Sequence, residues 1–169
     1  MIMDTLAAVA FSFEPPLKEY MYEKPKNKNE MIINNYMKQE ILITGSFSAL
    51  LCIIFLKLPL INNVFSNNND LMTAFFGLFI FMSIFNSFNA RTHRLNLLAH
   101  ITKNKVFLIV IIFILIVQIT LIYYGGDMFR TYGLTPFEFE VTVLIASLVI
   151  PIDWLRKIFL RKQGQIGGV

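Results

Sequence analysis

The chain has 169 residues, of which 56% are hydrophobic and only 15% are charged. Its mean hydropathy is +0.60, and its charged share lies well below the roughly 25% that is typical of soluble domains. The net charge is +4, and the single cysteine, Cys52, excludes an intramolecular disulfide framework. The composition therefore excludes an ordinary soluble domain and favours a chain that lies in a lipid bilayer.

The first segment, residues 1–13, is apolar except for three residues, one of which is Asp4. It is too short to cross a membrane, which takes about 20 residues, and it lacks the charged leader and cleavage site of a signal peptide. We therefore expect it to be the second half of a membrane helix. Glu14-Pro15-Pro16 ends this helix, because proline lacks an N–H and disfavours helix at the preceding residue.

Four apolar runs follow, and each approaches the roughly 20 residues that cross a hydrocarbon core about 30 Å thick. They cover residues 43–61, 71–88, 106–124 and 141–155. The domain organisation predicted from these runs is a cytoplasmic loop over 14–39, four transmembrane helices within 40–162, and a short tail over 163–169. The predicted fold class is all-α integral membrane, with a half helix plus a four-helix transmembrane bundle.

The last run has a clear beginning, because Thr135-Pro136-Phe137-Glu138 matches the capping-box pattern with proline at the first helical position. Pro151 lies inside the run, so we expect a kink there. Beyond it, the stretch from Trp154 to Lys162 mixes basic and apolar residues. We expect this stretch to be an interfacial anchor, with calmodulin or lipid binding as the alternative.

Basic residues alternate between the connecting segments. Most of the 15 Lys and Arg lie in residues 14–40, 91–105 and 156–162, whereas the loops near 62–70 and 125–138 hold only Arg130. The positive-inside rule therefore places the basic segments and the C-terminus in the cytoplasm. Because these clusters serve to orient the helices, we expect no nucleic-acid partner.

Five short pieces follow one another along the chain, and their order and spacing resemble the C-terminal membrane region of P-type calcium-transporting ATPases. They are Met3-Asp4-Thr5-Leu6-Ala7, Glu14-Pro15-Pro16, Met21 with Lys24-Pro25, Phe85-Asn86 with Asn89-Ala90-Arg91, and Gly125-Gly126. The resemblance extends to about Lys162. It implies that the chain carries the end of the family's sixth membrane helix and helices seven to ten, as part of an ATP-driven pump that transports calcium.

Asp4 is the principal candidate site residue. A carboxylate inside a membrane is costly, which alone marks it as a functional candidate, and the resemblance implies that it is a Ca²⁺ ligand. Calcium takes about 6–8 oxygen ligands, so the resemblance implies that the others come from helices outside this sequence. ATP and Mg²⁺ would act only through further domains, because this chain contains no Asp-Lys-Thr-Gly phosphorylation motif.

Two positions bear on the number of ions transported. Calcium pumps with two ion sites carry a Thr just before the helix-six Asp and a Glu on helix eight, whereas the matching residues here are Met3 and Ser83. Calcium prefers hard oxygen ligands, so a thioether is a poor substitute and a serine hydroxyl brings no charge. The resemblance therefore implies a pump with one ion site, similar to plasma-membrane calcium pumps.

Polar residues in the second and third runs have two possible roles. Ser83, Asn86 and Asn89 are spaced i, i+3, i+6 and share roughly one helix face. This face is either a polar seam along the ion pathway, for which Ser83 and Asn86 are candidates, or a set of helix–helix hydrogen bonds. We favour the second role, most strongly for Asn89, and we expect Gln118 to form an interhelical hydrogen bond.

The expected partners are the lipid bilayer and the remaining helices and cytosolic domains of the parent pump. Two alternatives stay open. One is a stand-alone small multi-span membrane protein with a structural or regulatory role, which begins at Met1. The other is the same domain of a pump for Na⁺, K⁺ or H⁺.

Overall fold

The computed structural model describes residues 2–14, 33, 35–92, 96–97 and 101–162, and for 2–4, 35, 36 and 102 it describes the backbone alone. In chain order its elements are α1 (Ile2–Ser12), α2 (Asn35–Lys57), α3 (Pro59–Asn62), α4 (Asn68–Arg91), the 3₁₀ turn η2 (Ile101–Lys103), α5 (Lys105–Tyr124), α6 (Gly126–Phe129), α7 (Pro136–Ser147) and α8 (Val149–Lys162). The described chain is therefore helical, which confirms the all-α class. Residues 15–32 and 34 of the predicted loop over 14–39, which include Met21 and Lys24-Pro25, lie outside the described residues, as does the tail over 163–169. Residues 35–39, which were also assigned to this loop, belong to α2.

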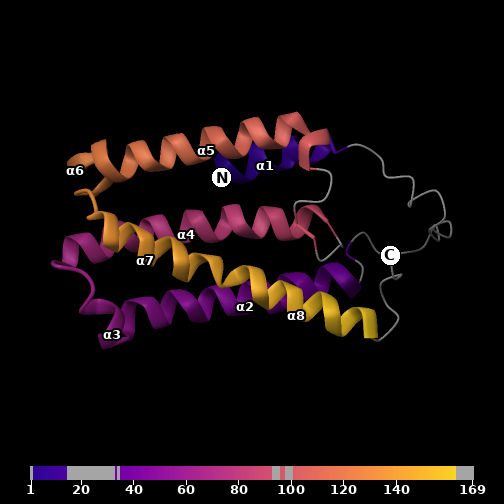
Figure 1. The fold of residues 1–169 in the computed structure, drawn as a ribbon, viewed down its shortest axis with the longest axis horizontal. Helices are drawn as coiled ribbons and strands as arrows, with labels where there is room; N and C mark the ends of the chain where they lie inside the picture. Colours follow the sequence, from indigo (N-terminus) through magenta and orange to yellow (C-terminus); the bar gives the residue numbers. More distant parts are fainter. Residues whose placement is uncertain (1, 15–32, 34, 93–95, 98–100, 163–169) are drawn as a thin grey trace.

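The long helices lie side by side and alternate in direction (Figure 1). At one end of the bundle α1, α4 and α8 finish and α2 and α5 begin. We call this the basic end, because exposed lysines gather there: Lys38, Lys103, Lys105 and Lys162. The opposite end carries the short helices α3 and α6.

Within the described ranges, three helices are long and apolar enough to cross a membrane, namely α2 from Met37 to Lys57, α4 and α5. They correspond to the first three predicted runs. α1 has 11 residues. Large apolar side chains such as Ile53 and Ile109 point outward and are 60% and 66% exposed, as expected for helices that face lipid.

The fourth predicted run consists of two helices, α7 and α8, which are separated by a turn at Leu148. The expected kink is therefore present, but it lies three residues before Pro151. Proline has no N–H to donate to the carbonyl four residues earlier, and its ring clashes with that carbonyl. The carbonyl in question belongs to Ser147, which is the last residue of α7.

α4 is the central helix, since it packs against α2, α5, α7 and α8. Gly77 lies beside two neighbouring helices, since a Cβ added there would make ordinary van der Waals contacts, 3.4 Å from Ile122 of α5 and 3.8 Å from Thr142 of α7. Phe81 of α4 meets Phe139 of α7 edge to face, with 5.6 Å between the ring centroids. The residues along α4 therefore face the rest of the bundle on several sides.

At the opposite end, Glu138 joins the start of α7 to the loop before α4. The predicted capping box is confirmed, because Thr135 Oγ1 accepts from the backbone N–H of Glu138 and the Glu138 carboxylate accepts from the backbone N–H of Thr135 (2.8 Å). The other carboxylate oxygen accepts from the backbone N–H of Ser66 (3.1 Å). Burial tends to raise the pKa of Glu138, but the hydrogen bonds from Thr135 and Ser66 outweigh it and hold this pKa below its ordinary value.

Candidate functional site

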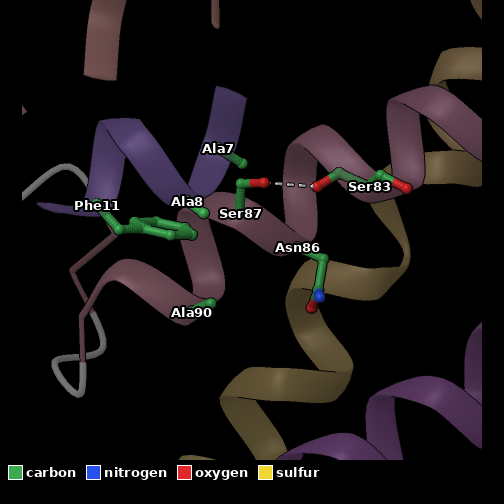
Figure 2. A pocket seen from close by; sticks show the side chains of 7 residues that line it. All are labelled: Ala7, Ala8, Phe11, Ser83, Asn86, Ser87 and Ala90. Carbon is green, nitrogen blue, oxygen red and sulfur yellow. Dashed lines mark hydrogen bonds between the residues drawn. The ribbon is translucent and has the colours of Figure 1, made fainter. Parts of the chain in front are cut away.

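A pocket of about 300 Å³ lies between α1 and α4 (Figure 2). Three residues of α1 and four of α4 line it: Ala7, Ala8, Phe11, Ser83, Asn86, Ser87 and Ala90. The small side chains of the three alanines leave the space unfilled, and the polar groups among these residues come from α4. The pocket therefore brings the short first helix beside the polar part of the central helix.

The polar wall of the pocket is rich in oxygen acceptors. Ser83 Oγ donates to the Phe79 carbonyl (3.0 Å), and Ser87 Oγ donates to the Ser83 carbonyl (2.9 Å), the bond drawn in Figure 2. Each bond uses the hydroxyl proton, so the lone pairs of both oxygens remain as acceptors. The Asn86 amide oxygen is buried and has no hydrogen-bond partner among the described residues. Such oxygens are the ligand type that hard cations prefer.

Asp4 lies on α1, but its side chain is outside the described part of the structure. Residues at i, i+3, i+4 and i+7 share one face of an α-helix. By this spacing Asp4 belongs to the same face as Ala7, Ala8 and Phe11, the three residues of α1 that line the pocket. Because α1 and α4 both finish at the basic end, Asp4 lies toward the Ser83 side of the pocket.

The polar residues that were predicted to share one face of α4 lie beside two different helices, α1 and α8. Ser83 and Asn86 line the pocket beside α1, whereas Asn89 is fully buried and its Nδ2 donates to the Val149 carbonyl of α8 (3.2 Å). A helix–helix hydrogen bond is therefore confirmed for Asn89. Gln118 is also buried, but neither polar atom of its amide has a hydrogen-bond partner among the described residues. The interhelical hydrogen bond predicted for Gln118 is therefore not formed with any described residue.

A second polar cluster is buried between α8, α2 and α4, near the basic end. Asp153 and Lys157, one turn apart on α8, are fully buried, with 2.6 Å between Nζ and Oδ2. Arg156 binds the other oxygen of Asp153 (2.7 Å) and lies 3.6 Å from the carboxylate of Glu40 on α2. Lys157 also donates to the Asn89 carbonyl of α4 (2.8 Å). We call these four charged residues the α8 ion cluster; its paired charges satisfy one another away from water.

The α8 ion cluster corrects the interpretation of the C-terminal basic stretch as an interfacial anchor. Arg156 and Lys157 are 3% and 0% exposed, whereas the apolar side chains beside them are the exposed ones: Trp154, Leu155, Ile158 and Phe159. α8 therefore turns its apolar side outward and its charged side toward α2 and α4. The anchor prediction is wrong for Arg156 and Lys157, because both pair with the buried Asp153. Lys157 also binds the Asn89 carbonyl of α4, and Arg156 lies near Glu40 of α2.

The sequence pointed to Ser83 and Asn86 but not to the rest of the pocket. Ala7, Ala8 and Phe11 carry no polar side chain, and only their helical spacing from Asp4 could have identified them. The pairing within α8 had a clearer signal, because oppositely charged residues spaced i, i+4 are neighbours on a helix surface. Asp153 and Lys157 have this spacing.

The sequence is similar to one described family and to several known proteins. Residues 1–159 match the family described as "Cation transporting ATPase, C-terminus". Calcium-transporting ATPase PAT1 of Dictyostelium discoideum is 33% identical over 96% of this chain and 16% of its own length. Calcium-transporting ATPase 2 of Cryptococcus neoformans is 29% identical over 92% of this chain and 11% of its own length.

A plant relative, the plasma membrane-type calcium-transporting ATPase 12 of Arabidopsis thaliana, is 29% identical over 93% of this chain and 15% of its own length. The chain thus spans less than a fifth of the length of these relatives. The family match covers nearly the whole of a chain whose three long helices can cross a membrane. The chain therefore belongs to the family formed by the C-terminal region of the cation-transporting ATPases.

Proposed function

We propose that this chain is the C-terminal membrane region of an ATP-driven calcium pump, in which it supplies part of the calcium site and supports the helices around it. The observation that carries this proposal is the pocket between α1 and α4, where Ser83, Asn86 and Ser87 line the side across from the helix that contains Asp4. The similarity to calcium-transporting ATPases over more than nine-tenths of the chain supports calcium as the transported ion.

Within this proposal each residue has a distinct role. Asp4 supplies a carboxylate ligand, and the oxygens of Ser83 and Asn86 are uncharged ligands along the path that the ion follows. Because calcium takes about 6–8 oxygen ligands, helices elsewhere in the pump complete the site. ATP hydrolysis, with its Mg²⁺, takes place in cytosolic domains of the same pump. Apart from those helices and domains, the partner of this chain is the lipid bilayer.

The pump moves one calcium ion per ATP. Met3 precedes Asp4 where a pump with two sites has a hydroxyl ligand, and Ser83 stands where such a pump has a carboxylate. Neither residue adds the negative charge that a second Ca²⁺ needs. The transport stoichiometry of the full-length protein in sealed vesicles tests this, and two calcium ions per ATP would reject the single site.

The decisive experiment replaces Asp4 with Asn in the full-length protein that carries this chain. Asp4→Asn keeps the size of the side chain but removes the charge, so calcium-dependent phosphorylation by ATP should be lost at calcium concentrations that saturate the unmodified pump. Asp127→Asn is the matched control, because Asp127 is exposed at the opposite end of the bundle. Retained calcium-dependent phosphorylation in Asp4→Asn would remove Asp4 from the site.

The two rival functions predict different results when phosphorylation by ATP is measured. A pump for Na⁺, K⁺ or H⁺ would be phosphorylated in response to that cation and not to calcium. A stand-alone membrane protein would have a stop codon rather than coding sequence in frame before Met1, and it would show no phosphorylation by ATP.

A further inference from the structure

The finishing end of α1 meets α4 and the start of α5 in a buried polar junction. Glu14 follows α1, and its two carboxylate oxygens bind different helices. Oε1 lies 2.9 Å from Nη1 of Arg91, the last residue of α4, and Oε2 accepts from Nδ2 of Asn104 (2.7 Å), which caps α5. Arg91 also donates to the Leu97 carbonyl (2.9 Å). One carboxylate therefore ties together three helix ends.

Asn104 satisfies two helices with one side chain. Its Oδ1 accepts from the backbone N–H of Phe107 in the first turn of α5 (2.9 Å), and its Nδ2 donates to the carbonyl of Ala10 in the last turn of α1 (3.0 Å). Both groups belong to the backbone sets that a helix leaves unpaired at its ends. Asn104 is 1% exposed and Ala10 is fully buried, so water does not substitute readily for either bond.

An aromatic cluster packs against the same junction. Phe107 is fully buried and stacks on Phe11 of α1, with 5.9 Å between the ring centroids. Phe88 of α4 meets Phe107 edge to face at 5.2 Å, and the guanidinium of Arg91 lies 5.6 Å from the centroid of the same ring. Phe11 also lines the pocket. The junction and the pocket wall are thus parts of one packed unit.

We propose that Glu14, Arg91 and Asn104 form a clamp that sets the depth and rotation of α1, and that they are thereby positioning residues for Asp4. This inference rests on the proposed function. Asp4 lies six residues before Ala10, which is about 9 Å along a helix at 1.5 Å per residue. The junction holds this end of α1 through the hydrogen bond from Asn104 to the Ala10 carbonyl and through the stacking of Phe11 on Phe107.

Two variants distinguish the clamp from ordinary capping of α5. Asn104→Ser keeps a hydroxyl that caps α5, because serine is a good N-cap residue, but it lacks the amide donor that reaches Ala10 and Glu14. Glu14→Gln is a second variant, which removes the charge opposite Arg91 at nearly constant shape. Glu140→Gln on α7 is the matched control, since Glu140 is exposed.

The functional test measures phosphorylation of the full-length protein by ATP as a function of calcium. Asn104→Ser and Glu14→Gln should raise the half-saturating calcium concentration by roughly 5- to 150-fold, the usual range for coupling between sites, with the maximal level retained. Glu140→Gln should match the unmodified protein. A fall in the maximal level at unchanged half-saturation would show a merely structural role and would overturn the clamp.

A distance measurement tests the clamp without reference to transport. Nitroxide labels are attached in the full-length protein at Ser12→Cys on α1 and Lys162→Cys on α8, both exposed positions, in a background without other reactive cysteines. The distance distribution by pulsed electron paramagnetic resonance should be narrow and should broaden in Asn104→Ser.

An unchanged distribution in Asn104→Ser overturns the clamp, even if Asp4→Asn abolishes the calcium response and the proposed function stands. If Asp4→Asn instead leaves that response intact, the proposed function fails, and the distribution still decides whether the junction holds α1. A broader distribution with an unchanged half-saturating calcium concentration would also overturn the positioning role.

Discussion

Asp153 and Lys157 are charged side chains with no exposed surface, on a helix whose neighbouring apolar residues are exposed. Moving a charge out of water costs several kcal/mol unless a partner compensates for it. The compensation here is local on α8, through the pairing of Lys157 and Arg156 with Asp153, and distant through Glu40 and the Asn89 carbonyl. The stability of α8 against α2 and α4 therefore depends on all partners being present.

We expect Lys157→Met to destabilise the protein by about 3–5 kcal/mol, the usual result of removing one partner of a buried ion pair. Methionine keeps the length of the side chain but leaves part of the Asp153 charge uncompensated. Thermal unfolding of the purified protein in detergent measures the change. Lys162→Met, at an exposed position, serves as the control. Adding Asp153→Asn to Lys157→Met should recover part of the loss, and equal losses in the two lysine variants would refute the pairing.

Glu138 makes the stability of the opposite end depend on pH. The pKa of Glu138 is lower in the folded state than its ordinary value. The ionised carboxylate therefore stabilises the folded protein fully at pH values above the pKa of glutamate in the unfolded chain, about 4.3. This stabilisation disappears as the pH falls through the folded pKa, because the protonated carboxyl accepts poorly from Thr135 and Ser66.

Acidification from about pH 6 to about pH 3 should therefore lower the melting temperature, and Glu138→Gln should reduce this dependence on pH. Glu140→Gln provides a comparison at an exposed position two residues away. Melting curves recorded by circular dichroism across this range provide the measurement. An identical pH dependence in the unmodified protein and in Glu138→Gln would show that the hydrogen-bonded carboxylate is not responsible.

At the scale of elements, the sequence predicted the start of α7 accurately, but it placed the break between α7 and α8 three residues too late. The pattern at Thr135 predicted the start of α7, and the structure confirms both hydrogen bonds of the capping box. Pro151 predicted a kink, but the turn lies at Leu148, because the missing donor and the ring of proline act on the carbonyl of Ser147. The fourth predicted run therefore consists of two shorter helices, α7 and α8, and not of one continuous helix.

Loss of the cap should have a measurable effect on α7. Thr135→Ala removes the hydroxyl that binds the backbone N–H of Glu138, which typically costs about 1 kcal/mol. For a chain of this size the melting temperature should fall by roughly 2–4 °C. Thr120→Ala is the control, because Thr120 is exposed on α5 and its hydroxyl donates to the Ile116 carbonyl of its own helix. Equal shifts in the two variants would argue against the cap.

For the whole molecule, the alternation of helix direction places four exposed lysines, Lys38, Lys103, Lys105 and Lys162, at one end of the bundle. We expect the basic end to face the cytoplasm. Lys162→Cys and Asn63→Cys, with Cys52→Ala, introduce reporters at exposed positions of the two ends. In sealed membranes of known orientation, an impermeant maleimide should label position 162 from the cytoplasmic face and position 63 from the other face. Labelling of both positions from one face would contradict this topology.

The candidate site could be predicted from the sequence only in part. Ser83 and Asn86 were candidates because polar residues stand out in an apolar run, and both line the pocket. Asn104 was missed, although an Asn directly before an apolar run is a recognisable N-cap signal. Neither Arg91 nor Arg156 was predicted to pair with a carboxylate, since composition does not show whether a cation faces a headgroup or a buried carboxylate.

The sequence by itself determined the helical class, three of the four predicted spans and the start of α7, because each depends on residues that are close together in the chain. It also determined the family, because the order and spacing of short motifs are read directly from the chain. Only the tertiary structure decided which side of α8 faces inward and that Glu14 meets Arg91 and Asn104, which lie 77 and 90 positions away. Such contacts depend on the rotation and register of whole helices against one another. Packing across the bundle sets these quantities, and no local pattern encodes them.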